Sequence, residues 1–247
     1  MSKRYLVLLC VLLSCSAAKE TPVKTFQKKL DKMSAGEVNT TYTTICANLE
    51  KSRKSLAKEL ANAKTKEAKS AVYTRARNLL IKTFSDSLFV CWYGTEWDFN
   101  GTTTTPRDGE IACGYFVTTL VRDAGFKIER AKLAQCASQS MINTLCPAAD
   151  VKIITGGQVQ KVKDHILAKP DGIFIVGLDT HTGFIVKKGT DLRFVHSNYT
   201  LASDGVMSES FDESSVIQNN GYFAIGNFLN SDSTIMKWLN GSEYAME

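Results

Sequence analysis

Three residues in this chain have the types that nucleophilic catalysis uses: Cys113, His181 and His196. A cysteine thiolate attacks a carbonyl carbon, a histidine takes the thiol proton as general base, and a third polar group fixes the tautomer of that histidine. We assign these roles to Cys113, His181 and His196 in that order. The chain has only one other histidine, His165, which lies in a lysine-rich segment.

The cysteine stands at the start of a predicted amphipathic helix. Phe116, Leu120 and Ala124 recur at helical spacing, and Gly125 is a good helix-ending residue. The positive end of the helix dipole favours an anion, so we expect the pKa of the Cys113 thiol to fall. Taken alone, such a cysteine is more often a small buried core residue. The presence of the two histidines favours the interpretation of Cys113 as a nucleophile over that of a core residue.

The two histidines flank a predicted β-hairpin formed by residues 181–186 and 192–196. A two-residue turn at Lys188-Gly189 would place His181 opposite His196. Opposed side chains share a face of the sheet and have Cβ atoms about 5 Å apart. An isolated histidine is more often a satisfied core or surface residue, but this pairing favours a catalytic pair.

Helical patterns fill the first part of the chain and strand patterns the last part. Residues 23–84 predict two long helices, arranged as a hairpin, and a short helix near 25–33. We expect a loop over 89–108, helices over 131–145 and 158–168, and strands over 172–178, 181–186, 192–196 and 221–228. Helices followed by an antiparallel sheet predict an α+β layer fold.

Residues 1–18 have the pattern of a secretory signal peptide: a basic start at Lys3 and Arg4, a short apolar run and then small residues. The stretch Leu12-Leu13-Ser14-Cys15 also resembles a bacterial lipobox, in which Cys15 would be lipidated. Plain cleavage and lipidation both stay open. We therefore divide the chain into a leader (1–18), a helical amino-terminal arm (19–85) and a catalytic domain (86–247).

Five cysteines follow the leader, an odd number, so at least one thiol is free or pairs with another chain. Export would permit disulfides. Cys136 and Cys146 could bridge locally, and Cys46 and Cys91 could tie the arm to the next domain. The pairing cannot be read from the sequence.

The net charge of +5 is modest, and much of it comes from lysines between Lys19 and Lys69. No basic patch is interleaved with aromatic residues, so we expect no nucleic-acid partner. Membrane contact is expected only through a lipid anchor at the amino terminus. No oligomeric state follows from the sequence.

Residues 76–228 resemble the NlpC-type cell-wall cysteine peptidases, which belong to the papain-like superfamily. That family shows a Gly-x-Pro-Tyr loop, a helix beginning near Asp-Cys-Ser-Gly, a His-Val-Gly strand and a strand ending in Ile-His-Ala/Ser. The corresponding stretches here are Gly94-Thr95-Glu96-Trp97, Ala112-Cys113-Gly114-Tyr115, His181-Thr182-Gly183 and Val195-His196-Ser197.

The resemblance implies a papain-like fold, with Cys113 as nucleophile, His181 as base and His196 as third residue. It places Trp97, in the position of the family's tyrosine, and Gly114 at the oxyanion and substrate cleft. It implies an exported bacterial hydrolase, periplasmic or bound to the envelope, that cleaves peptide or amide bonds of peptidoglycan stem peptides through an acyl-enzyme. No cofactor or metal is expected.

Departures from the family pattern leave the substrate open. Ala-Cys-Gly-Tyr replaces Asp-Cys-Ser-Gly, and Trp97 offers only an indole N–H. A papain-like acyltransferase or amidase with another envelope substrate would use the same triad. A non-catalytic wall-binding module would instead use aromatic residues near Trp92, Trp97 and Phe99 to hold a glycan or peptide. A zinc site built from the triad residues lacks the short ligand spacings of structural zinc sites.

Overall fold

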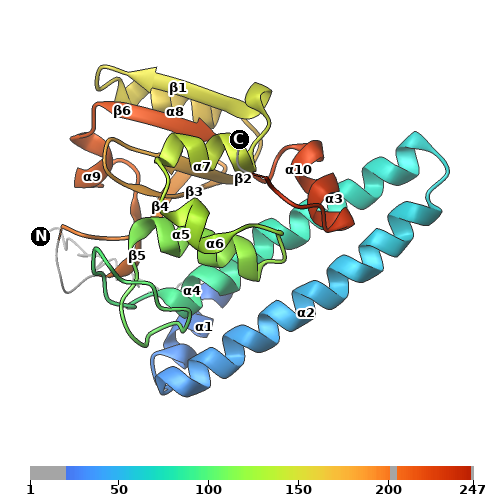
Figure 1. Ribbon diagram of the computed structural model, residues 1–247, viewed down its shortest axis with the longest axis horizontal. Helices are drawn as coiled ribbons and strands as arrows, with labels where there is room; N and C mark the ends of the chain where they lie inside the picture. Colours follow the sequence, from blue (N-terminus) through green and yellow to red (C-terminus); the bar gives the residue numbers. More distant parts are fainter. Residues whose placement is uncertain (1–20, 201–204, 246–247) are drawn as a thin grey trace, which may run out of the picture.

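The computed structural model describes residues 21–200 and 205–245, so the predicted leader, including Cys15, lies outside the described residues. The chain is α+β, with helices first and an open, six-stranded antiparallel sheet after them (Figure 1). This coarse architecture confirms the predicted class.

Helices account for most of the first half of the described chain. The long hairpin predicted from the sequence is present, and each of its helices begins at a capping side chain, Ser34 or Thr65. The helices are α1 (Pro22–Leu30), α2 (Ala35–Asn62), α3 (Lys66–Thr83), the π-helical η1 (Phe84–Leu88), α4 (Phe89–Trp92), α5 (Cys113–Asp123), α6 (Arg130–Ala134), α7 (Ser138–Leu145), the 3₁₀ turn η2 (Ala148–Asp150), α8 (Val159–Leu167), α9 (Ser215–Gln218) and α10 (Asp232–Asn240).

Two helical expectations were wrong in detail. The loop expected from Phe89 begins later, because η1 and α4 continue α3 and bury all four residues of α4. The helix expected over 131–145 is broken into α6 and α7. Ala137, with φ −55° and ψ 141°, turns the backbone there.

The sheet has the order β1-β6-β2-β3-β4-β5, and all its neighbours are antiparallel. Strands β2 (Gly172–Gly177), β3 (Thr182–Lys188), β4 (Asp191–Ser197) and β6 (Tyr222–Gly226) correspond to predicted strands. Strands β1 (Val151–Thr155) and β5 (Val206–Ser210) were missed.

The β3–β4 register differs by two residues from the expected one. Lys188 pairs with Asp191, so the turn residues are Gly189 and Thr190 instead of Lys188 and Gly189. Gly189 has φ +59°, a backbone conformation that glycine adopts without steric cost. A shift of two keeps every side chain on its expected face, because strand side chains alternate with period two.

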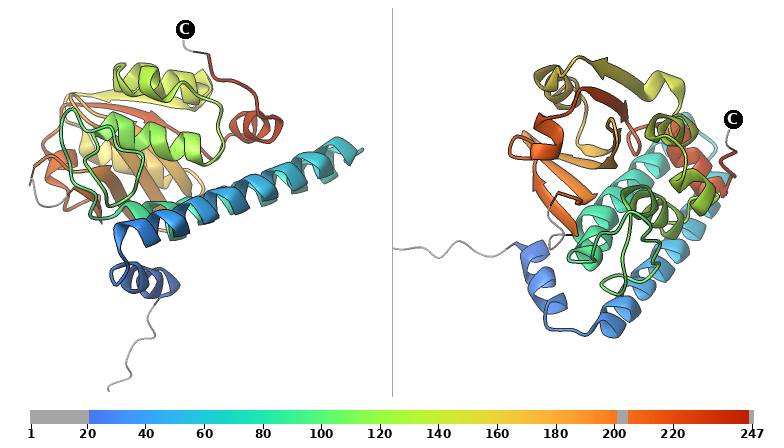
Figure 2. Two further views of the ribbon diagram at one scale, coloured as in Figure 1. Left: turned by 60° about the horizontal axis from the view of Figure 1, so that its bottom comes forward. Right: turned by 60° about the vertical axis from the view of Figure 1, so that its left-hand side comes forward.

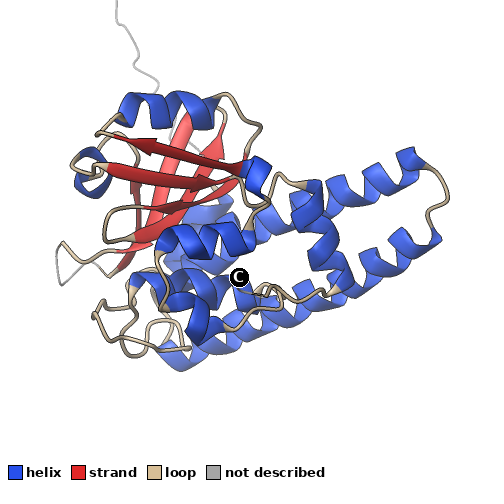
Figure 3. Cartoon of the chain, turned by 45° about the horizontal axis from the view of Figure 1, so that its top comes forward, coloured by secondary structure: helices blue, strands red, loops and turns tan. Residues whose placement is uncertain are grey.

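Helices cover both faces of the sheet (Figure 3). On one face, Ile173, Ile175 and Phe184 pack with the buried residues of α5 and α7. On the other face, Phe174 and Phe194 pack with residues of α8 and α9. The sheet is therefore the middle layer of three.

Aromatic packing joins the helical arm to the face of the sheet that α5 and α7 cover. The ring of Phe184 lies 5.9 Å from Phe84, 5.1 Å from Phe89 and 6.0 Å from Phe116, measured between ring centroids. These contacts tie η1, α4 and α5 to β3. Tilted and edge-on aromatic pairs at such distances add to the stabilisation from burial.

The hairpin of α2 and α3 also packs against α10 and extends beyond the sheet layers (Figure 2). Arg53 on α2 pairs with Glu50 and donates hydrogen bonds to the carbonyls of Trp238 (3.2 Å) and Leu239 (3.0 Å). Since the last carbonyls of a helix lack intrahelical donors, Arg53 caps α10.

We expect Phe184→Ala to lower the free energy of unfolding by about 3–5 kcal/mol, because it removes a fully buried ring and leaves a cavity. Phe99→Ala is the matched control, since Phe99 is 79% exposed, and it should change the value by less than about 0.5 kcal/mol. Chemical denaturation followed by circular dichroism measures both. Equal effects of the two substitutions would contradict this account of the core.

Candidate active site

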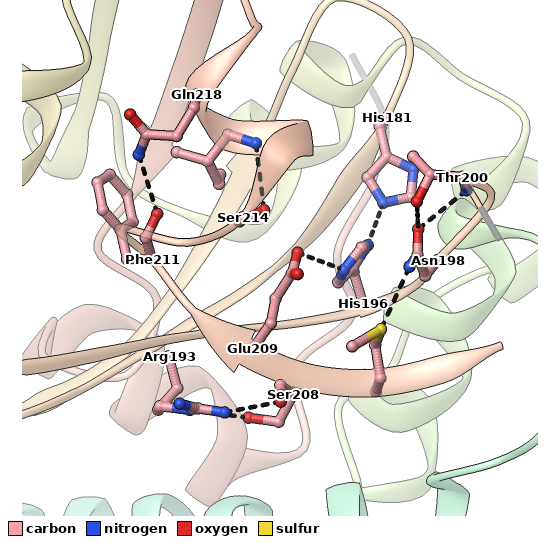
Figure 4. A network of polar contacts seen from close by, with 12 residues as sticks. His181, Arg193, His196, Asn198, Thr200, Ser208, Glu209, Phe211, Ser214 and Gln218 are labelled. Carbon is pink, nitrogen blue, oxygen red and sulfur yellow. Dashed lines mark hydrogen bonds and ion pairs between the residues drawn. The ribbon is translucent and has the colours of Figure 1, made fainter. Parts of the chain in front are cut away.

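The two histidines are joined by a direct hydrogen bond. His181 Nε2 and His196 Nδ1 lie 2.8 Å apart, and His196 Nε2 lies 3.1 Å from Glu209 Oε1 on β5 (Figure 4). His181 is 4% exposed and His196 is fully buried. His196 also stacks on Phe194, with ring centroids 4.1 Å apart. The expected neighbourhood of the histidines is present, with a carboxylate behind it.

Burial determines the charge of the two imidazoles. Burial and the neighbouring His196 hold the pKa of His181 well below its usual value. Burial also lowers the pKa of His196, although Glu209 opposes that change. Burial raises the pKa of Glu209, but hydrogen bonds from His196 and Ser214 more than compensate and lower it overall. Near neutral pH, two neutral imidazoles therefore face an ionised carboxylate.

The carboxylate fixes both tautomers. A carboxylate only accepts hydrogen bonds, so the His196 nitrogen that faces Glu209, Nε2, carries the proton. Neutral His196 then has an acceptor at Nδ1, and His181 must donate from Nε2. The remaining nitrogen, His181 Nδ1, keeps its lone pair. This is the nitrogen that a general base needs.

Cys113 is the first residue of α5 and is half-buried. Burial raises the pKa of its thiol, while hydrogen bonds from the backbone N–H groups of Thr182, Gly114 and Cys113 itself act in the opposite direction. The expected fall in pKa was therefore wrong, because loss of solvent outweighs the helix terminus. Contact with Thr182 places the thiol beside the residue that follows His181.

Two tethers hold α5 in this position. The hydroxyl of Ser197, next to His196, donates to the carbonyl of Ile111 at 2.7 Å. Gly114 lies against α6, where an added Cβ would approach the carbonyl oxygen of Ala134 to 2.4 Å. Only glycine allows this approach, so Gly114 positions the first turn of the cysteine helix.

Cys113 and His181 line one pocket of about 390 Å³. Its walls come from the start of α5, the segment that joins α6 to α7, the β2–β3 connection and Tyr222 on β6. Tyr222 donates a hydrogen bond to Gln139 Oε1 at 2.6 Å, which gives the pocket a polar wall. Gly114 belongs to this lining.

Trp97 is not among the described residues that line this pocket, and its ring packs 6.1 Å from Tyr199. Tyr199 in turn lies 5.0 Å from the ring of His181. Trp97 is therefore linked to His181 through the ring of Tyr199.

Sequence reasoning missed Glu209. Its strand, Val206-Met207-Ser208-Glu209-Ser210, is short and polar, without the apolar alternation that identifies strands. The sequence did offer one signal for this strand: after His196, Gly205 is followed by a segment of strand length that contains an acidic residue. Pairing of His196 with Met207 and of Phe194 with Glu209 brings that carboxylate to the histidine diagonally across the strands.

The other cysteines are free thiols in the described part of the chain, so neither suggested disulfide is formed. Within residues 21–200 and 205–245, no three His, Cys, Asp or Glu side chains are grouped to hold a metal ion. Over the same residues, no helix combines the length and hydropathy needed to cross a bilayer.

Comparison with known protein families, curated proteins and solved structures found no match to this chain.

The lowered pKa of the two histidines predicts the pH dependence of folding. The unfolded chain takes up protons near pH 6.5, whereas the folded chain resists protonation until lower pH. The free energy of unfolding should therefore fall as the pH drops below about 6.5. Denaturation between pH 5 and 8 measures this, and His181→Gln should flatten the dependence. An unchanged slope in that variant would contradict a neutral buried His181.

Proposed function

We propose that this protein is an exported bacterial cysteine hydrolase with a papain-like, NlpC-type domain, which cleaves peptide or amide bonds in peptidoglycan stem peptides. One observation carries the proposal: the hydrogen-bonded series Glu209–His196–His181 ends in the pocket that Cys113 lines. The resemblance of the sequence motifs supplies the substrate class, and the leader at residues 1–18 supports export, with lipidation of Cys15 as one form of it.

In the resting site the thiol and the imidazole are both neutral, because burial raises the pKa of Cys113 and lowers that of His181. As Cys113 Sγ attacks the substrate carbonyl carbon, its proton passes to His181 Nδ1. The new imidazolium donates from Nε2 to His196 and is stabilised by Glu209 behind it. Backbone N–H groups at the start of α5 face the developing oxyanion.

The tetrahedral intermediate collapses when His181 returns the proton to the leaving amine. A thioester on Cys113 and a free amine result. Water, deprotonated by His181, then attacks the thioester carbonyl and releases the carboxylate product and the thiol. If an amine replaced water in this second step, the same residues would perform acyl transfer.

Digestion of purified peptidoglycan tests this function. The wild-type chain should release muropeptide fragments with new amino and carboxyl ends, and Cys113→Ala should release none. His181→Ala should lower the rate about 10²–10⁴-fold, since that is the usual contribution of general acid–base catalysis. Mass spectrometry of the fragments identifies the bond and separates hydrolysis from acyl transfer. Saturable binding without cleavage by the wild-type chain would favour a wall-binding module instead.

Glu209→Gln should separate charge from hydrogen bonding. The amide keeps an acceptor for His196 Nε2 but removes the negative charge, so we expect kcat to fall about tenfold, a loss of about 1.4 kcal/mol of transition-state stabilisation. Glu209→Ala, which also loses the acceptor, should cost more. Steady-state kinetics and the pH profile of kcat measure this. Equal activity of wild type and Glu209→Ala would show that the carboxylate does not act on the histidine pair.

A further inference from the structure

We infer that the pocket beside Cys113 recognises a positively charged amine on the substrate, and that Asp179 is the residue that recognises it. The use of this preference in hydrolysis rests on the function proposed above. The electrostatic selectivity of the pocket is independent of that function, because it acts on any charged reagent that enters the pocket.

The first observation is the charge of the pocket lining. Among the described residues that line it, Asp179 is the only one with an acidic or basic side chain other than the buried, neutral His181. The other polar groups are hydroxyls and an amide: Ser138, Gln139, Thr180, Thr182 and Tyr222. No cation of the lining therefore offsets the carboxylate of Asp179.

The second observation is that this carboxylate is held in place. Its Oδ2 accepts a hydrogen bond from the backbone N–H of Gly221 at 2.9 Å, and the Asp179 N–H donates to Asn220 Oδ1 at 3.1 Å. The side chain is exposed. Within the described residues its other oxygen, Oδ1, accepts no hydrogen bond, so a ligand can use it.

The third observation is the position of Asp179 relative to the reacting groups. The N–H of Leu178 bonds to the carbonyl of His181 at 2.8 Å, so Asp179 and Thr180 form the whole connection between these paired residues. The carboxylate is thereby fixed two residues from His181 and shares a pocket with Cys113.

These features fit a primary ammonium group. It is a compact charge with three donors, which can reach a carboxylate and a neighbouring neutral acceptor together. A carboxylate on the substrate would meet repulsion and no compensating cation. The preferred substrate is therefore an amide that carries an amine close to the bond that is cut.

Charged thiol reagents test the pocket without a substrate. Aminoethyl, methyl and sulfonatoethyl methanethiosulfonates carry charges of plus one, zero and minus one. In each case the Cys113 thiolate attacks the sulfenyl sulfur, forms a mixed disulfide and expels methanesulfinate. Peptide mapping by mass spectrometry separates labelling of Cys113 from that of Cys136, which lines the same pocket.

We expect Cys113 to react faster with the cationic than with the anionic reagent, relative to a free small thiol. Asp179→Asn should lower this ratio about two- to fivefold, the range for an exposed ion pair. Asp179→Ser, which keeps an acceptor for Gly221, should do the same. Asp191→Asn is the matched control, since Asp191 is an exposed carboxylate at the opposite end of the β3–β4 hairpin. An unchanged ratio in both folded Asp179 variants would overturn the inference.

Matched amide substrates with lysine, norleucine or glutamate beside the scissile bond test the catalytic consequence. Asp179→Asn should lower kcat/KM for the lysine substrate by a similar factor and leave the norleucine substrate unchanged. Equal losses on both substrates would assign Asp179 a structural role and overturn the inference. If Asp179→Asn shifts the labelling ratio but the wild-type chain cleaves none of the substrates, the result would contradict the proposed hydrolase function and support the charge selectivity of the pocket.

Discussion

The hydrogen bond between His181 and His196 joins two nitrogens that are each able to donate or accept, and Glu209 decides which one donates. Without the carboxylate, either imidazole could carry the proton at the shared contact. With it, His196 donates to Glu209, His181 donates to His196, and His181 Nδ1 is left as a base. In the proposed mechanism, the direction of proton transfer therefore depends on one side chain of β5.

Burial has two opposing effects on this arrangement. It strengthens the hydrogen bond between the imidazoles, because the local dielectric constant is low. It also disfavours every charged form, which raises the pKa of Cys113 and lowers that of His181. The site therefore holds a neutral thiol and a neutral imidazole, and in the proposed mechanism charge separates only as the thiol attacks the substrate. The backbone N–H groups of Thr182, Gly114 and Cys113 act against this effect of burial, because they lower the pKa of the thiol.

The sequence was sufficient to predict those parts of the site that lie in elements with a clear periodic pattern. The apolar stripe of α5 correctly predicted that Cys113 lies at the start of a helix. The prediction that the two histidines share a face remained correct despite the register error of two residues, because that shift leaves each strand face unchanged. The polar strand β5 has no such pattern, so Glu209 could not be found. The helix through Phe89–Trp92 reads as an aromatic loop, because it is buried on every side and shows no amphipathic period.

Strand β3 is where the two halves of the site meet, and two adjacent residues make this possible. An added Cβ at Gly183 would lie 2.9 Å from His196 Cβ and 2.7 Å from Phe194 Cε2, so a glycine there lets His196 approach His181. Phe184 points to the opposite face, where it packs against Phe116 of the cysteine helix. Position 183 thus accommodates the histidines, and position 184 fixes α5. Because these residues are neighbours on one strand, any movement of α5 along the sheet also changes the separation between the Cys113 thiol and His181.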